Sequence, residues 1–354
     1  MTDLVIGVDI GGTKVLAGEV DDAGRVVATA RRSTPGRRVE VELVEDALTE
    51  AVMEVAAGRP IAGVGLAAAG FVDAEGERVM FAPHLPWRAD PTRSRLEARW
   101  GVPVALDNDA NCAALAELAV GAARGFSDVL LVTMGTGIGG ALTVNGRLLR
   151  GRNGMAGEFG HMQVVPGGHA CECGGTGCWE QYTSGNALVR YARARLDAAT
   201  REDQSLLEEL CDDDPSNLTG PMITEAAEAG DGLALQAFGV IGDWLGVGIA
   251  NLVAAFDPQL VVIGGGVSAA GDLLLDPARE GLARSLVGAG HREIPDVVRS
   301  AFGPESGVVG AATLARATAD LTVSSRRRTG RAARATWWRP STRTRRGTRR
   351  STAK

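Results

Sequence analysis

Three of the five cysteines of this chain, and two of its four histidines, lie in one glycine-rich stretch at residues 160–181. Thiolate sulfur and imidazole nitrogen are ligands that zinc prefers, and a closed structural zinc site takes four of them. The candidate ligands are His161, Cys171, Cys173 and Cys178. His169 is a competing ligand, and free surface thiols are the alternative, although three cysteines within eight residues favour a metal. We expect a structural zinc ion that fixes this loop and does not activate water.

A second candidate site is the turn DIGGTK at residues 9–14. Paired glycines expose backbone N–H groups that suit a phosphate, and Thr13 adds a hydroxyl donor. Asp9 could hold Mg²⁺ through water, because Mg²⁺ takes few carboxylates and keeps several waters. Lys14 is one of two lysines in a chain with 37 lysines and arginines, which indicates that a compact ammonium group is needed there. A tight β-hairpin with an incidental lysine is the alternative.

Two more glycine-rich turns follow apolar segments that we predict to be strands: MGTGIGG at residues 134–140 and IGGG at residues 263–266. One such turn is weak evidence. Three of them, two on similar halves of the chain, indicate a nucleotide held between two domains. The chain has no GxxxxGK(S/T) phosphate loop, and a strand rather than a helix follows the first glycine turn, which argues against a Rossmann unit.

The stretch LDNDANCAAL at residues 106–115 places four polar side chains between a predicted strand and a predicted helix: Asp107, Asn108, Asp109 and Asn111. Asn108 or Asp109 could cap that helix, which is the commonest role for such residues. The functional alternative is a carboxylate at the cleft that accepts a proton from a substrate hydroxyl, a step worth roughly 10²–10⁴ in rate.

Hydrophobic periodicity places these motifs on an α/β framework. We expect strands at residues 4–8, 15–20, 26–30, 61–66 and 102–106, and helices at 39–57, 92–100 and 110–120. Residues 128–149 repeat the pattern of residues 4–27, with a strand, a glycine-threonine turn, a second strand and a polar turn, which indicates duplication of one domain. Further on, we expect a core helix at 231–256, a strand at 260–263, and a helix at 307–318 that packs back on the first half.

Charge is distributed unevenly along the chain. The net charge is −6, but after Asp320 there are eleven arginines, Lys354 and no acid, so the rest carries about −18 and is expected to bind nucleic acid poorly. The segment 319–354 is expected to be a disordered tail, either a nucleic-acid or membrane-surface arm or a non-functional extension. The N-terminus lacks a signal-peptide pattern, and polar residues within 233–256 favour a buried helix, so we expect a cytoplasmic protein without a membrane span.

The motifs, taken in order, resemble one known family. DIGGTK, NDAN (108–111), GTGIGG, GEFGH (157–161), CECGGTGCWEQY (171–182) and VIGGGVS (262–268) are together similar to the ROK sugar kinases, and specifically to the actinobacterial-type glucokinases. The resemblance covers roughly residues 3–318. It implies a duplicated, actin-like (ribonuclease-H-like) α/β fold of two domains, with ATP and sugar in the interdomain cleft. The domains expected are 1–110 plus about 303–318, and 111–302.

The resemblance also implies roles for single residues, with Asp109 as the catalytic base. The expected sugar contacts are Gly70, Asn108, Asp109, Glu158, His161 and Glu180. Together with Asp9 and Lys14, the expected nucleotide-site residues are Gly11, Gly12, Thr13, Gly135, Thr136, Gly137, Gly265 and Gly266. The zinc ligands of the family match His161, Cys171, Cys173 and Cys178, which leaves His169 as a bystander. His161 would then stand beside both the metal and the sugar.

The activity that the resemblance implies is ATP-dependent phosphorylation of glucose to glucose 6-phosphate in glycolysis, with Mg²⁺, in a homodimer or homotetramer. The alternatives are a kinase for mannose, fructose or an N-acetylated amino sugar, polyphosphate as the phosphoryl donor, and a non-catalytic sugar sensor. Ala69 and His84 depart from the family pattern, in which proline and asparagine are common at these positions, and both bear on the sugar pocket.

Overall fold

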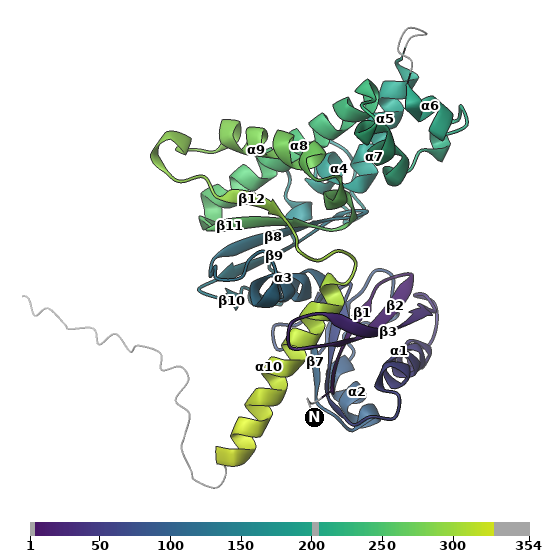
Figure 1. Ribbon diagram of the computed structural model, residues 1–354, viewed down its shortest axis with the longest axis vertical. Coiled ribbons are helices and arrows are strands. Elements are labelled where there is room, and N and C mark those ends of the chain that lie inside the picture. Colours follow the sequence, from purple (N-terminus) through teal and green to yellow (C-terminus); the bar gives the residue numbers. More distant parts are fainter. Residues whose placement is uncertain (1–3, 200–204, 329–354) are drawn as a thin grey trace, which may run out of the picture. The chain divides into compact units, whose positions relative to one another are not determined.

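The computed structural model describes residues 4–199 and 205–328 (Figure 1). Residues Met1–Ala319 form one compact unit, which contains two five-stranded sheets, and Asp320–Lys354 form a second unit. The first sheet has the strand order β3-β2-β1-β4-β7, and the second has the order β10-β9-β8-β11-β12. In both sheets the central strand pairs antiparallel with the strand that follows it and parallel with a later one. The matching topologies agree with the predicted duplication.

The strands lie close to their predicted positions. The first sheet is made of β1 (Leu4–Ile10), β2 (Lys14–Val20), β3 (Val26–Ser33), β4 (Ile61–Ala68) and β7 (Val104–Asn108). The second sheet is made of β8 (Val129–Met134), β9 (Ile138–Val144), β10 (Arg147–Leu148), β11 (Leu260–Gly264) and β12 (Asp296–Arg299). A small hairpin pairs β5 (Phe71–Val72) with β6 (Val79–Phe81). Nearly every residue of β1, β4, β8 and β11 is buried, as expected for strands covered on both faces.

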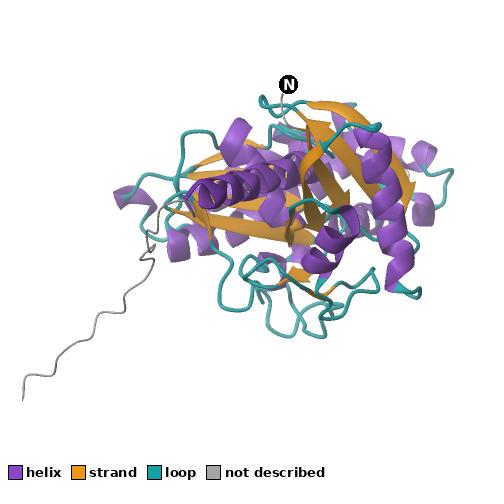
Figure 2. Cartoon of the chain, turned by 90° about the horizontal axis from the view of Figure 1, so that it is seen from below, coloured by secondary structure: helices purple, strands orange, loops and turns teal. Residues whose placement is uncertain are grey.

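Helices cover the sheets (Figure 2). The longer ones are α1 (Val41–Ala56), α2 (Thr92–Trp100), α3 (Asp109–Val120), α5 (Gly185–Asp197), α7 (Gly220–Glu228), α8 (Gly232–Phe256), α9 (Asp272–Ser285) and α10 (Ser306–Arg328). Two further helices are short, α4 (Glu180–Thr183) and α6 (Leu206–Leu210). Short 3₁₀ turns are η1 (Phe159–His161), η2 (Pro215–Asn217), η3 (Gly266–Ala270) and η4 (Ala289–His291).

Helix α3 contacts both sheets and therefore occupies the centre of the compact unit. Its alanines at 113 and 114 pack with Val129 and Leu131 of the second sheet. Its Cys112 packs with Ala67 of the first sheet and with Ala311 of α10. A chemical group at the start of α3 is thus held by both halves of the molecule.

Helix α10 returns from the second half to the first sheet, as predicted. A Cβ atom at Gly7 would lie 1.9 Å from the carbonyl oxygen of Val308, and one at Gly65 would lie 1.8 Å from that of Ala311. Only glycine in β1 and β4 allows the helix backbone to approach this closely. The predicted end at residue 318 is wrong, because α10 continues to Arg328. Its sequence contains neither glycine nor proline between Gly310 and Gly330, so nothing interrupts the helix.

This extension also corrects the predicted disordered tail, since 319–328 are helical. Residues 329–354 of the predicted tail lie outside the described residues.

Helix α8 is the one helix in the described part of the chain with the length and apolar character of a membrane span. It lies in the core instead, where Phe238, Ile241 and Leu245 are buried. Asp231 caps its start by accepting a hydrogen bond from the backbone N–H of Ala234 at 2.8 Å. The predicted buried helix is therefore present, one residue shorter than expected.

Candidate active site

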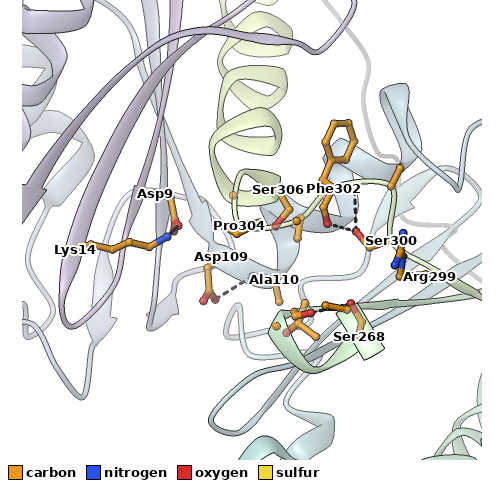
Figure 3. Close-up of a pocket in the computed structure, with 18 residues that line it drawn as sticks. Asp9, Lys14, Asp109, Ala110, Ser268, Arg299, Ser300, Phe302, Pro304 and Ser306 are labelled. Carbon is orange, nitrogen blue, oxygen red and sulfur yellow. Dashed lines mark hydrogen bonds and ion pairs between the residues drawn. The ribbon is translucent and has the colours of Figure 1, made fainter. Parts of the chain in front are cut away.

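A cavity of about 700 Å³ lies beside the N-terminal end of α3 and is lined by both halves of the compact unit. The first half contributes Asp9 of β1, Lys14 of β2 and Asp109 of α3 (Figure 3). The second half contributes Thr133 of β8, the glycines after β11, and the chain between β12 and α10. This volume is in the range of small-molecule sites.

Local structure leaves Asp109 free for chemistry. Asn108, and not Asp109, caps α3, because its Oδ1 accepts from the backbone N–H groups of Ala110 at 2.9 Å and Asn111 at 3.2 Å. Asp109 is the first helical residue and lines the cavity. One of its oxygens accepts a hydrogen bond from the N–H of Ala110 at 2.9 Å, which fixes the carboxylate. Burial raises the pKa of Asp109. Asn108 therefore takes the capping role, and Asp109 remains the candidate for the functional one.

Asp9 and Lys14 face each other across the first glycine turn. The Lys14 Nζ lies 3.8 Å from Asp9 Oδ2, and Figure 3 shows the ammonium group reaching toward that carboxylate. Burial, reinforced by the charge of Asp109, raises the pKa of Asp9 to about 6, and Lys14 opposes this shift. Two carboxylates that repel each other in a cavity suit a further cation.

The predicted sugar contacts fall into two groups. In the first, the Asn108 side chain donates from Nδ2 to the carbonyl oxygen of Gly70 at 3.0 Å. In the second, His161 lies between two carboxylates, with Nε2 3.9 Å from Glu158 and Nδ1 3.6 Å from Glu180. Burial raises the pKa of Glu158, as do the charges of Asp109 and Glu180, while His161 lowers it. Asp109 thus lines the cavity and is also close enough to the second group for its charge to act on Glu158.

The four predicted metal ligands come together. The donor atoms of His161, Cys171, Cys173 and Cys178 all lie within 4.8 Å of one another. Cys171 Sγ is 3.7 Å from His161 Nδ1, and Cys173 Sγ is 3.6 Å from Cys178 Sγ. Bonds of about 2.1 Å to nitrogen and 2.3 Å to sulfur in a tetrahedron place ligand atoms about 3.5–3.8 Å apart, so the cluster fits zinc.

The backbone of the loop is shaped for this cluster. Cys171 donates from its N–H to the Gly175 carbonyl at 2.9 Å and accepts from the Gly174 N–H at 3.0 Å. Gly177 has a φ of 71°, and a Cβ there would lie 1.7 Å from the Val165 carbonyl oxygen. The remaining candidate ligand, His169, packs on the ring of Tyr182 at 5.2 Å between centroids and is not part of the cluster.

The comparison with known families decides what kind of protein this is. The ROK family model matches residues 5–318. The chain belongs to the ROK family. The glucokinase of Streptomyces coelicolor is 44% identical over 313 residues, which cover 88% of this chain and 98% of that protein. The glucokinase of Thermotoga maritima is 34% identical over 315 residues, which cover 88% and 96%.

A solved structure supports the same assignment. The crystal structure of a ROK family glucokinase from Streptomyces griseus, in complex with glucose and AMPPNP, matches with a TM-score of 0.80 at 45% identity. The match covers 89% of this chain and 99% of that chain. The expected fold class, the duplicated actin-like architecture of ROK sugar kinases, is confirmed.

The glycine motifs of this ROK chain divide between the cavity and its surroundings. Gly265 and Gly266 line the cavity, as do Asp9 and Lys14. The remaining expected nucleotide-site residues are not among the lining residues: Gly11, Gly12, Thr13, Gly135, Thr136 and Gly137. In the second turn, the Gly135 carbonyl accepts from the Gly185 N–H at 2.8 Å. A Cβ at Gly137 would lie 2.5 Å from Glu180 Oε2. This turn therefore packs against the starts of α4 and α5.

The largest set of lining residues was not predicted. It is the chain from the end of β12 to the start of α10: Arg299, Ser300, Ala301, Phe302, Gly303, Pro304, Ser306 and Gly307. Its sequence, RSAFGPESG, follows a four-residue strand and has no periodicity. The Gly-Pro pair signals a loop, which was the one available clue.

Proposed function

We propose that this ROK protein transfers the terminal phosphoryl group of ATP to the 6-hydroxyl of glucose and so forms glucose 6-phosphate. The observation that carries the proposal is the position of Asp109. Its carboxylate lines a cavity that also exposes Asp9, Lys14 and the Gly265–Gly266 turn. The glucokinase relatives and the neighbour solved with glucose and AMPPNP support the substrate pair.

Asp109 acts in this proposal as the general base. A carboxylate accepts a proton best when its pKa approaches the working pH, and burial raises the pKa of Asp109 in that direction. The Ala110 N–H at 2.9 Å keeps one oxygen in place and leaves the other for the sugar hydroxyl. The proton of the 6-hydroxyl passes to this oxygen as the new O–P bond forms and the bond from the γ-phosphorus to the bridging oxygen breaks, which releases ADP. Positioning and electrostatic stabilisation supply the rest of the rate.

Asp9 and Lys14 act on the phosphate side. Lys14 offers a point charge to the phosphates, and bare amides of the glycine turns complement it: Gly11, Gly12, Thr13, Gly135, Thr136, Gly137, Gly265 and Gly266. The repulsion between Asp9 and Asp109 suits a divalent cation, and Asp9 is the residue that would hold Mg²⁺ through water. When bound, Mg²⁺ supplies charge neutralisation for the phosphoryl group.

The metal loop, the stretch of residues 160–181 that contains the four clustered ligands, acts on the sugar side. Nδ1 of His161 faces the thiol cluster, so zinc there would leave Nε2 as the N–H donor, directed toward Glu158 and the sugar. Zinc supplies rigidity here. Gly70, Asn108, Glu158, His161 and Glu180 then hold the sugar hydroxyls around Asp109.

The wider setting follows from the same proposal. The domains 1–110 with about 303–318, and 111–302, close over the substrates and exclude water. The enzyme works in the cytoplasm, in carbohydrate metabolism, as a homodimer or homotetramer. His84, whose side chain packs against Gly12, bears on the choice of hexose.

A coupled assay with glucose and ATP tests the proposal, with mannose, fructose and an N-acetylated amino sugar as competing acceptors and polyphosphate as competing donor. Asp109→Asn retains an oxygen for the Ala110 N–H but loses the base, so turnover should fall by roughly 10²–10⁴ while glucose still binds. Asp272→Asn, an exposed substitution on α9, is the control. Near-normal turnover of Asp109→Asn would contradict the assignment. Glucose binding without turnover in the unaltered protein would favour a sugar sensor.

A further inference from the structure

Glu117 is a buried carboxylate that the proposed chemistry does not use. It lies on α3, eight residues after Asp109, and its exposed fraction is 1%. Four donors surround it. Oε2 accepts from the backbone N–H of Ala122 at 2.7 Å and of Ala301 at 3.2 Å. Oε1 accepts from the N–H of Phe302 at 3.3 Å and from the Ser300 hydroxyl.

Three of these four donors belong to the wall of the cavity. Ser300, Ala301 and Phe302 all line it, and they connect β12 to α10. The Ser300 N–H donates to the Ile263 carbonyl at 2.8 Å, so the same segment also attaches to β11 just before the Gly265–Gly266 turn. Residues 300–302 themselves belong to no helix or strand. Glu117 is therefore the main polar anchor of this segment to α3.

This wall carries one of the two cationic side chains that line the cavity. Arg299 lies on the side opposite Lys14 in Figure 3, and its guanidinium has no hydrogen-bond or ion-pair partner among the residues described. Lys14, in contrast, is paired with Asp9. An unpaired guanidinium at the rim of a phosphate-binding cavity is suited to an anionic ligand.

We propose that Glu117 is a positioning residue for the donor side of the active site: it holds residues 299–302, and with them Arg299, against the bound nucleotide. This inference rests on the proposed function, since it takes the cavity to be the nucleotide site. Because one rigid helix carries both Asp109 and Glu117, about 12 Å apart along its axis, the wall is kept in register with the base. A charged acceptor shared by several donors gives stronger hydrogen bonds than a neutral one, which explains why a carboxylate is buried here.

The test compares steady-state kinetics of Glu117→Gln with those of two other variants. The amide loses the charge and one acceptor, so the KM for ATP should rise about tenfold, the change that corresponds to ~1.4 kcal/mol, while the KM for glucose stays near its normal value. Ser300→Ala removes one donor from the same network and should raise the KM for ATP in the same selective way by a smaller factor. If Glu117→Gln does not fold, the KM for ATP of Ser300→Ala alone tests the inference.

Asp231→Asn is the matched control. Its carboxylate also accepts from three donors, the hydroxyl of Ser205 and the backbone N–H groups of Leu206 and Ala234, but it lies at the start of α8. It should lower the melting temperature without changing the ratio of the two KM values. The inference is overturned if Glu117→Gln and Ser300→Ala leave the KM for ATP unchanged, or if they raise both KM values by the same factor.

The unaltered protein separates failure of the inference from failure of the proposed function. If it phosphorylates glucose and AMPPNP raises its melting temperature, a normal KM for ATP in both variants overturns the role of Glu117 alone. If it does neither, the cavity is not a nucleotide site, and both proposals are overturned.

Discussion

Arg150 donates two hydrogen bonds to one oxygen of Asp107, from Nε at 2.9 Å and from Nη2 at 2.6 Å. The other oxygen of Asp107 accepts from the N–H of Asn108 at 2.8 Å and from Nδ2 of Asn111 at 2.7 Å. The carboxylate is almost fully buried, and it lies two residues before Asp109, which lines the cavity. Arg150 follows β10 of the second sheet, whereas Asp107 is the residue before the last in β7 of the first. The pair thus joins the two halves just behind Asp109.

Arg150→Met should strongly destabilise the protein. Removal of one partner leaves the Asp107 charge buried and uncompensated, which typically costs about 3–5 kcal/mol. The free energy of unfolding in urea measures this cost. Arg284→Met is the control, because Arg284 pairs with Asp243 at a site where both side chains are exposed. Such pairs contribute about 0–1 kcal/mol, so equal losses in the two variants would contradict the prediction.

Asp9→Asn should make the protein more stable at pH 7.5 and less active. Asp9 has a pKa of about 6 in the fold, against 3.8 for an unperturbed Asp. Its ionised form therefore opposes folding, with the full cost present above pH 6 and lost as the pH falls toward 3.8. At one pKa unit per ~1.4 kcal/mol, the variant should gain about 3 kcal/mol at pH 7.5.

Unfolding measured at two pH values tests whether this gain in stability comes from removing the ionised Asp9 carboxylate. The difference in stability between Asp9→Asn and the unaltered protein should shrink to roughly half at pH 5, where the folded carboxyl is mostly protonated. Use of ATP should fall over the same range, below about pH 6, as the negative charge that attracts a cation is lost. A gain in stability that does not change with pH would show that desolvation of Asp9 is not its cause.

Most of the framework could be predicted because it depends on local pattern. The predicted helix at 92–100 matches α2 at both ends, and the first strands differ from prediction by three residues or fewer. In contrast, strand β12 was not predicted. It has four residues, one of them buried, and is held in the sheet by its pairing with β11. A strand this short has no recognisable alternation of buried and exposed residues. The cavity wall that follows it, at residues 299–307, was therefore not predicted either.

The structure brings together the acids and the four candidate metal ligands that the sequence singled out, but places only two of the expected glycines in the cavity. Asp9, Lys14 and Asp109 share the cavity as expected, because Asp9 lies near the end of the central strand β1, Lys14 begins β2, and Asp109 begins α3 directly after β7. The turn at 134–137 resembles the first turn in sequence but packs against Gly185 and Glu180. Sequence similarity between the two turns could not show this, since the packing depends on α4 and α5, which have no counterpart in the first half.

Cys173→Ser should abolish zinc binding and weaken glucose binding. The substitution removes one of four soft ligands, and the metal loop then loses the contact that fixes His161 beside Glu158. We expect the zinc content to fall from about one ion per chain to near zero, and the KM for glucose to rise by roughly tenfold or more. Elemental analysis and kinetics on the same samples measure both effects.

Cys211→Ser provides the matched control for this variant. Cys211 is also buried, but it lies at the end of α6 and is not one of the four clustered donors. It should retain zinc and glucose affinity.

Burial raises the pKa of the Cys171 thiol to about 12, so zinc binding to metal-free protein should also release protons. A zinc-free enzyme with normal glucose kinetics would contradict the proposed role of the loop.

Lys14→Arg should lower activity although it conserves charge. The Lys14 ammonium lies 3.8 Å from Asp9 Oδ2, a separation that leaves both groups available to ligands. The planar guanidinium of arginine favours two parallel hydrogen bonds to a carboxylate, so it would engage Asp9 in place of the phosphates. We expect kcat/KM for ATP to fall about tenfold, with the KM for glucose unchanged. Arg25→Lys, at an exposed pair with Asp21, is the control and should have no effect. Equal activity of Lys14→Arg and the unaltered enzyme would mean that lysine at this position, in a chain with only one other lysine, has no functional cause.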